Sequence, residues 1–240
     1  MRPIDVARKL GVSTSALRNY EVFGFVPPVE RTVAGYRVYT AEHLAYFTAA
    51  REMMPGFSFP SIGTILGEVM AQRIEAALWL ATKAQAELHQ EREIAERVVA
   101  RLLRKTRVSV DKRQCLTVKD MSRETGIPVT TIRYWEKVGL LHAERRENNY
   151  RLFPASQVQR ALVIYALKLA VYADNQRYFI DSIRADLEAF DCNDRGRIER
   201  MTSGIARHLD QLNRDRIRGI AALHRLCLQV EAGCFDPEQR

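Results

Sequence analysis

The 240-residue sequence has few of the features that mark secreted, disulfide-rich or membrane proteins. Its four cysteines, Cys115, Cys192, Cys227 and Cys234, are too few and too scattered for a disulfide scaffold, so we expect free thiols. No uninterrupted apolar run is long enough to span a bilayer, and the first residues, MRPIDVARKL, contain no apolar segment of signal-peptide length. The sequence therefore predicts a cytoplasmic protein.

Motifs of catalysis are missing as well. The sequence has no glycine-rich phosphate loop, no Gly-x-Ser-x-Gly, no His-Glu-x-x-His and no His/Asp/Ser spacing of catalytic type. The charged run from Glu91 to Arg97 has the pattern of a solvated helix face rather than of an acid–base pair. We therefore expect that the protein is not an enzyme.

What the sequence has in excess is positive charge. Its 37 lysines and arginines outnumber 29 aspartates and glutamates, which gives a net charge of +8 and a pI near 9.5. Basic proteins attract polyanions through counterion release, and nucleic acid is the commonest such partner. Charge alone does not decide between classes, because mitochondrial and ribosomal enzymes can be equally basic.

The most informative feature is an internal repeat. Residues 3–44 are echoed by residues 117–158. Four positions align without a gap and two more after the loss of one residue: Gly11, Arg18, Glu21, Gly24, Tyr36 and Arg37 fall on Gly126, Arg133, Glu136, Gly139, Tyr150 and Arg151. A repeat of this length, spaced about half the chain apart, is a duplicated domain rather than a solenoid unit.

Each copy has the pattern of two short helices followed by a hairpin. In the first copy Val6 and Leu10 share a helical face, Gly11 ends that helix, and Ser13 can cap the next one. Alternation of period two around Gly35, and around Asn149 in the second copy, predicts a two-stranded hairpin. The sequence thus predicts a helix-turn-helix with a small β wing, twice.

A long helix without proline is predicted after each copy, over residues 72–104 and 197–232. Apolar residues recur in both at a spacing of about 3.5, as in a coiled coil. They are Ile74, Ala77, Ala81, Ala84, Leu88, Ala95, Val98 and Leu102 in the first helix, and Met201, Ile205, Leu209, Leu212, Ile220, Leu223, Cys227 and Val230 in the second.

The predicted fold is therefore mainly α-helical, with two winged helix-turn-helix domains, each with a small β-hairpin wing. Each domain is followed by a long helix, and the two long helices pair in an antiparallel coiled coil. The boundaries we expect are 1–70 and 116–192 for the winged domains, 71–105 and 193–234 for the long helices, 106–115 for a linker and 235–240 for a tail.

This order of elements resembles the MerR family of bacterial transcription regulators. The resemblance rests on GVSTSALRNYEVFGFV with GYRVYT in the first copy and on GIPVTTIRYWEKVGLL with NYRLFP in the second. It implies a sequence-specific regulator that binds and distorts promoter DNA so that RNA polymerase can engage, located at the nucleoid when bound. An architectural or excisionase-like DNA-bending protein is the alternative, because such proteins share the winged motif.

The outward side of each second helix is polar and basic enough to enter a major groove. The DNA-binding residues we expect are Ser13, Thr14, Arg18, Asn19, Tyr20, Tyr36 and Arg37 in the first copy, and Thr130, Thr131, Arg133, Tyr134, Trp135, Tyr150 and Arg151 in the second. The resemblance implies contacts from the arginines and from the aromatic residues. For Tyr20 and Trp135 a second interpretation stays open, in which the ring packs in the core.

Some residues depart from the family pattern. Asn19 stands where an aromatic residue or histidine is usual, and Asn149 replaces the wing glycine. The element Gly56-Phe57-Ser58 of the first copy has no counterpart in the second. DNA contacts from the helix pair that follows the second wing are therefore not expected on this basis.

Cysteine placement allows one further hypothesis. Metal-sensing members of the family carry cysteines near the two ends of the long helix, and Cys192, His224, Cys227 and Cys234 are the candidates here, with ligand types that suit Zn²⁺ or Cu⁺. We favour the other interpretation, an apolar seam residue at Cys227 and incidental thiols, because no Cys-x-x-Cys pair is present. No metal or other cofactor is therefore expected.

Assembly also has two alternatives. Family members have one winged unit per chain and dimerise through their long helices, whereas this sequence holds both units and both helices. A tethered partner has a high effective concentration, which favours pairing within the chain as an intramolecular pseudo-dimer. The other alternative is a homodimer with four winged units.

Overall fold

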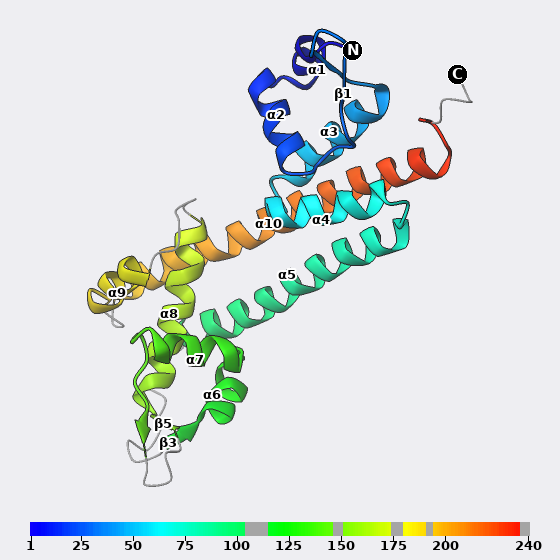
Figure 1. The fold of residues 1–240 in the computed structure, drawn as a ribbon. Helices are drawn as coiled ribbons and strands as arrows, with labels where there is room; N and C mark the ends of the chain where they lie inside the picture. Colours follow the sequence, from blue (N-terminus) through cyan, green and yellow to red (C-terminus); the bar gives the residue numbers. More distant parts are fainter. Residues whose placement is uncertain (104–114, 146–150, 174–179, 191–193, 236–240) are drawn as a thin grey trace. The chain divides into compact units, whose positions relative to one another are not determined.

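The structure is a computed structural model, and it describes residues 1–103, 115–145, 151–173, 180–190 and 194–235 (Figure 1). The fold is mostly helical with small antiparallel hairpins and two long helices, as the sequence predicts. The expected linker up to residue 114, Asn149, Tyr150, Cys192 and the tail from residue 236 lie outside the described residues. None of the described helices is both long and apolar enough to cross a lipid bilayer.

The chain divides into two compact units. The first unit comprises Met1–Leu88 together with Gln211–Arg240, and the second comprises His89–Asp210. The first unit is therefore discontinuous in sequence, because the end of the chain returns to it. Each unit holds one winged helix-turn-helix and one part of each long helix.

The first unit begins with the predicted helix-turn-helix, formed by α1 (Pro3–Leu10) and α2 (Thr14–Val22). Gly11 ends α1 with a φ of 63°, a left-handed conformation that glycine adopts without strain. Ser13 caps α2, since its side chain accepts a hydrogen bond from the backbone N–H of Ala16. The two local signals in the sequence, a glycine stop and a serine cap, thus set the turn between the helices.

A short wing and two helices complete the winged part of the first unit. Strands β1 (Glu30–Arg31) and β2 (Arg37–Val38) pair antiparallel, and helices α3 (Ala41–Met53) and α4 (Phe59–Met70) follow them. The core gathers buried side chains from these helices and from the segments between them, and the largest include Leu17, Phe25, Tyr39, Tyr46, Phe47 and Met53. Burial of this apolar surface holds the recognition helix against the rest of the unit.

Both long helices contribute to the first unit. Helix α5 (Ile74–Leu103) places Ala77 and Ala81 in the core, and helix α10 (Arg195–Glu231) places Leu223 and Cys227 there. Asn213 accepts a hydrogen bond of 2.6 Å from Gln85 Nε2. Arg216 donates a hydrogen bond to the backbone oxygen of Ala84, so within this unit the two helices run antiparallel. Pairing along the whole length as a coiled coil stays a prediction.

Glycines allow α10 to approach the junction between α3 and α4 closely. A Cβ atom on Gly56 would lie 2.6 Å from the backbone nitrogen of Arg216, and one on Gly219 would lie 3.0 Å from Cα of Met53. Arg216 donates from Nε to the Gly56 oxygen at 2.8 Å and stacks over the Phe57 ring at 5.6 Å. The element Gly56-Phe57-Ser58 therefore binds α10, a role that its sequence did not indicate.

The second unit repeats the winged arrangement. Helices α6 (Val118–Thr125) and α7 (Val129–Lys137) form its helix-turn-helix, and Gly126 ends α6 with a φ of 78°. Its wing has three strands rather than the two expected, because β3 (Cys115–Thr117) pairs with β5 (Arg151–Pro154), which also pairs with β4 (Glu144–Arg145). The extra strand has a counterpart in the first unit, where the Tyr39 N–H donates to the Met1 oxygen.

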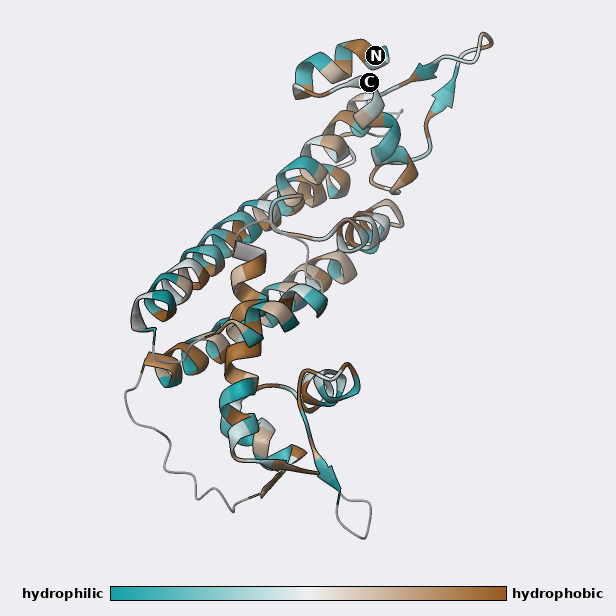
Figure 2. Cartoon of the chain, turned by 90° about the vertical axis from the view of Figure 1, so that its left-hand side faces the viewer, coloured by the Kyte–Doolittle hydropathy of each residue, from teal (hydrophilic) through white to brown (hydrophobic). Residues whose placement is uncertain are grey.

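Helices α8 (Ser156–Ala173) and α9 (Ile180–Glu188) complete the second unit with parts of α5 and α10. Helix α8 is buried on most of its circumference and is the mostly brown helix that runs vertically in Figure 2. Glu91 of α5 pairs with Lys168 of α8, and Arg92 of α5 pairs with Asp210 of α10 at 3.7 Å. In this unit one ion pair therefore joins α5 to the buried helix α8, and another joins α5 to α10.

Candidate nucleic-acid interface

The recognition helices α2 and α7 present polar side chains to solvent. In α2, Arg18 and Asn19 are exposed, whereas Thr14 is half-buried and the Ser13 hydroxyl is engaged in the cap. In α7, Thr130 and Arg133 are exposed, Tyr134 has 47% of its surface exposed, and Thr131 is half-buried. Ser15, which aligns with Thr130, is also exposed and was not among the residues expected from the sequence.

The structure separates the aromatic candidates. Trp135 has 1% of its surface exposed and lies in the core of the second unit, so the packing interpretation applies and its indole has no surface with which to contact DNA. Tyr20 is half-buried, with its ring centroid 5.8 Å from that of Phe25 and 5.9 Å from that of Phe47. Tyr36 in the wing is 73% exposed. Aromatic type alone could not distinguish these three environments.

Each wing places two arginines directly opposite each other. Arg31 pairs with Arg37 across β1 and β2, and Arg145 pairs with Arg151 across β4 and β5. Arg31 also donates to the backbone oxygen of Gly35 at 3.3 Å. Arg31 and Arg145 were not among the residues expected from the sequence, although the matching Glu-Arg pairs at residues 30–31 and 144–145 are a signal that could have identified them.

An ion pair joins each recognition helix to its wing at the same place in the repeat. Glu21 of α2 accepts hydrogen bonds from Nε of Arg37 at 2.9 and 3.0 Å, and Glu136 of α7 accepts one from Nε of Arg151 at 3.0 Å. The hydrogen bond to Glu21 raises the pKa of Arg37. Each wing arginine is thus oriented by a carboxylate one helical turn from Arg18 or Arg133.

The two ion pairs differ in a third contact. In the first unit the Tyr39 hydroxyl also donates to Glu21, and the pKa of this buried Tyr39 is raised, first by burial and then by the hydrogen bond. Phe153 takes the place of Tyr39 in the second unit and has no hydroxyl to donate. Glu136 therefore lacks the contact that Glu21 receives from the tyrosine.

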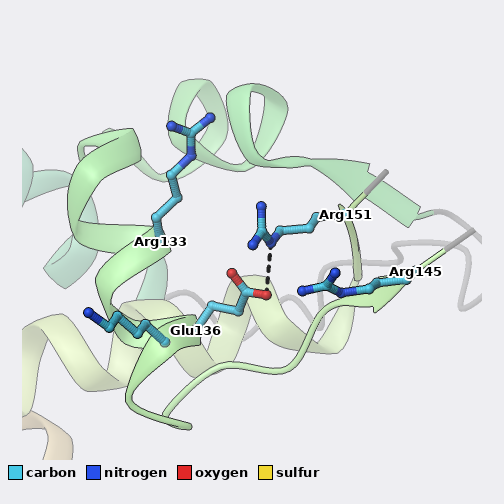
Figure 3. Close-up of a pocket in the computed structure, with 5 residues that line it drawn as sticks. Arg133, Glu136, Arg145 and Arg151 are labelled. Carbon is cyan, nitrogen blue, oxygen red and sulfur yellow. Dashed lines mark hydrogen bonds and ion pairs between the residues drawn. The ribbon is translucent and has the colours of Figure 1, made fainter. Parts of the chain in front are cut away.

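The second unit has a basic pocket between α7 and the wing, with a volume of about 360 Å³. It is lined by Arg133, Glu136, Lys137, Arg145 and Arg151, four cations around one carboxylate. The guanidinium groups of Arg145 and Arg151 point toward Glu136, and Arg133 extends from α7 on the other side of the pocket (Figure 3). An excess of cations around one carboxylate suits a phosphate group, which arginine can bind with two hydrogen bonds.

The candidate metal ligands differ in how deeply they are buried. Cys227 is 1% exposed in the core of the first unit, where burial raises the pKa of its thiol to about 11. Cys234 and His224 are exposed, and Cys115 is half-buried in β3. Within the part of the chain that the structure describes, His, Cys, Asp and Glu side chains form no group of three that could hold a metal ion.

Two segments match the sequence profile of a known family. Residues 2–39 and 117–153 match the MerR family regulatory protein, so the chain carries two MerR-type segments, consistent with a tandem duplication. Together they cover the two helix-turn-helix motifs and both wings.

The relatives match over a short stretch. The transcriptional regulator CueR of Salmonella typhi is 40% identical over 63 residues, 26% of this chain and 46% of that protein. The mercuric resistance operon regulatory protein of Bacillus cereus is 37% identical over 68 residues, 27% of this chain and 50% of that protein. The chain thus spans about half the length of these relatives. A solved MerR family transcriptional regulator from Listeria monocytogenes is 28% identical, covering 42% of this chain and 80% of that one, with a TM-score of 0.35.

Proposed function

We propose that this chain, which carries two segments of the MerR family, is a transcription regulator that binds double-stranded promoter DNA with both winged units. The observation that carries the proposal is the Glu–Arg pair between recognition helix and wing, built twice from matching residues, Glu21 with Arg37 and Glu136 with Arg151. This pair fixes the angle between a helix that fits a major groove and a basic hairpin that can reach the flanking phosphates.

Within each unit the side chains have separate roles in this proposal. Arg18 and Arg133 project from the exposed faces of α2 and α7 and read base edges, with Asn19 and Tyr134 beside them. Thr14, Thr130 and Thr131 line the same helices, and Ser13 holds the start of α2 as its cap. The wing residues Tyr36, Arg37 and Arg151 contact the backbone, as does Tyr150, and Tyr20 can direct its hydroxyl to a phosphate.

The end of the chain supports assembly within a single molecule. Residues 211–231 of α10, which follow the second copy of the repeat in sequence, complete the core of the first unit. A unit completed in this way needs no second chain. We therefore propose an intramolecular pseudo-dimer that works in the cytoplasm at promoters bound by RNA polymerase, with bending or untwisting of the DNA between unequal half-sites.

Binding-site selection from random-sequence DNA tests the proposal. The chain should enrich a bipartite site, and the double variant Arg18→Ala with Arg133→Ala should enrich none under the same salt conditions. A transcription assay on the selected site, with purified RNA polymerase, then separates a regulator from an architectural DNA-bending protein. Failure to enrich any site would contradict sequence-specific DNA binding.

A further inference from the structure

The two units differ at the end of the recognition helix. Lys137, the last residue of α7, lines the basic pocket of the second unit, whereas the aligned residue of the first unit is Val22, the last residue of α2, which is 82% exposed. The other pocket residues all have basic or acidic counterparts: Arg133, Glu136, Arg145 and Arg151 align with Arg18, Glu21, Arg31 and Arg37. Of these aligned positions, four are cationic in the second unit and three in the first.

The wing arginines also differ in the solvent exposure of their side chains. Arg37 has 24% of its side chain exposed and is held by Glu21, which the Tyr39 hydroxyl holds in turn. Arg151 has 47% exposed, and Phe153 gives its partner Glu136 no such additional contact. Binding a phosphate costs more free energy for a guanidinium that is already paired and largely covered, because the existing ion pair must be weakened.

From these two differences we infer that the units divide DNA binding unequally. In the second unit Lys137, Arg145 and Arg151 of the pocket bind a backbone phosphate while Arg133 beside them faces the bases, and this unit supplies more of the electrostatic affinity than the first. The first unit, with Val22 and a covered Arg37, contributes fewer phosphate contacts. The inference rests on the proposed function, since it names which half of the same interface binds the phosphates more strongly.

The salt dependence of DNA affinity measures how many phosphate contacts each unit contributes. Each phosphate that a protein neutralises on B-DNA makes the slope of log K against log salt steeper by about 0.9. A cation gained or lost at the pocket should therefore change the slope by about that amount. Over a fourfold rise in salt this corresponds to a difference of about 3.5-fold in how far affinity falls.

A reciprocal exchange at the two aligned positions is the test. Lys137→Val should make the slope shallower by about 0.9. Val22→Lys should make it steeper by a smaller amount, because Arg37 of the first unit is largely covered and held by Glu21. Binding is measured on a mixed-sequence duplex long enough for both units, by fluorescence anisotropy at several salt concentrations. Both side chains are exposed, so unchanged thermal melting of each variant is the control for folding.

A second experiment tests the effect of the covered Arg37 with a substitution that changes no charge. Tyr39→Phe removes the hydroxyl that holds Glu21 and makes the first unit match Phe153 of the second. It should steepen the salt slope of the Val22→Lys variant further. Equal slopes for Lys137→Val and the unchanged chain, or a larger effect of Val22→Lys than of Lys137→Val, would overturn the inference while leaving DNA binding intact. Absence of DNA binding by the unchanged chain would overturn the proposed function itself.

Discussion

Arg31 and Arg37 lie directly opposite each other on the two strands of the first wing, and Arg145 and Arg151 repeat this relationship in the second. Like charges at directly opposed positions destabilise a hairpin. In each pair one arginine is bound by a carboxylate of the recognition helix, Arg37 by Glu21 and Arg151 by Glu136. An anionic ligand would offset this repulsion, and a DNA phosphate fits both the charge and the position beside a recognition helix.

Loss of the recognition arginines should weaken specific binding. Arg18→Ala and Arg133→Ala each remove an exposed guanidinium from the centre of a recognition helix. If each makes a bidentate base contact, the loss is about 1 to 3 kcal/mol, on the order of fivefold to 150-fold in affinity. Binding isotherms on the selected site at fixed salt give the measurement. Isotherms that coincide with that of the unchanged chain for both variants would remove these helices from the major groove.

Removal of one of the opposed wing arginines should lower DNA affinity with little change in the free energy of unfolding. Arg31→Gln removes one of two opposed charges, which stabilises the hairpin, and weakens an exposed hydrogen bond to Gly35, which destabilises it. Because these effects offset each other, the free energy of unfolding should change by less than about 0.5 kcal/mol. DNA affinity should still fall, because a phosphate contact is lost. The matched control is Lys83→Gln on the exposed face of α5, which changes net charge equally and should leave DNA affinity closer to that of the unchanged chain. Equal losses of affinity in the two variants would count against a role for the wing.

A methyl group at Gly56 should destabilise the first unit. The added Cβ would lie 2.6 Å from the Arg216 backbone nitrogen, closer than van der Waals contact allows, and α10 would have to shift. We expect Gly56→Ala to lower the free energy of unfolding by about 1 to 3 kcal/mol in urea denaturation.

Gly67→Ala is the control for this substitution. A Cβ on Gly67 meets nothing within 4 Å, and the residue lies within helix α4, so alanine there should raise stability by about 0.5 to 1 kcal/mol. If both alanine variants were equally stable, the close approach of α10 to the α3–α4 junction would not hold in solution.

Some of this architecture could be predicted from the sequence and some could not, for physical reasons. The glycine stop at Gly11 and the cap at Ser13 are local signals, so the helix-turn-helix could be predicted. The role of Gly56 could not, because its neighbour Arg216 is 160 residues away in sequence. Trp135 could be placed in the core or at DNA on residue type alone, and only its contacts decide. The strand at Cys115–Thr117 is too short to give a periodic signal.

The cysteines should behave as unlinked thiols rather than as a metal site. Since burial raises the pKa of Cys227 to about 11, this group is a neutral thiol throughout the physiological range and its thiolate appears only as the pH rises toward that value. At pH 8, iodoacetamide should modify the exposed Cys234 and leave Cys227 unmodified in the native chain, as peptide mass spectrometry can measure. Cys234→Ser should leave DNA affinity unchanged. Stoichiometric Zn²⁺ or Cu⁺ in the purified protein, lost in this variant, would contradict the prediction and indicate a metal sensor.

We propose above all that one chain brings two different winged units to one DNA site. Light scattering of the complex with the selected duplex, together with hydroxyl-radical footprinting, tests it most directly. We expect a mass of one chain per duplex and a footprint of two unequal halves, of which Arg18→Ala weakens one and Arg133→Ala the other. Two chains per duplex with a longer, symmetric footprint would contradict it, because that is the pattern of a homodimer with four winged units.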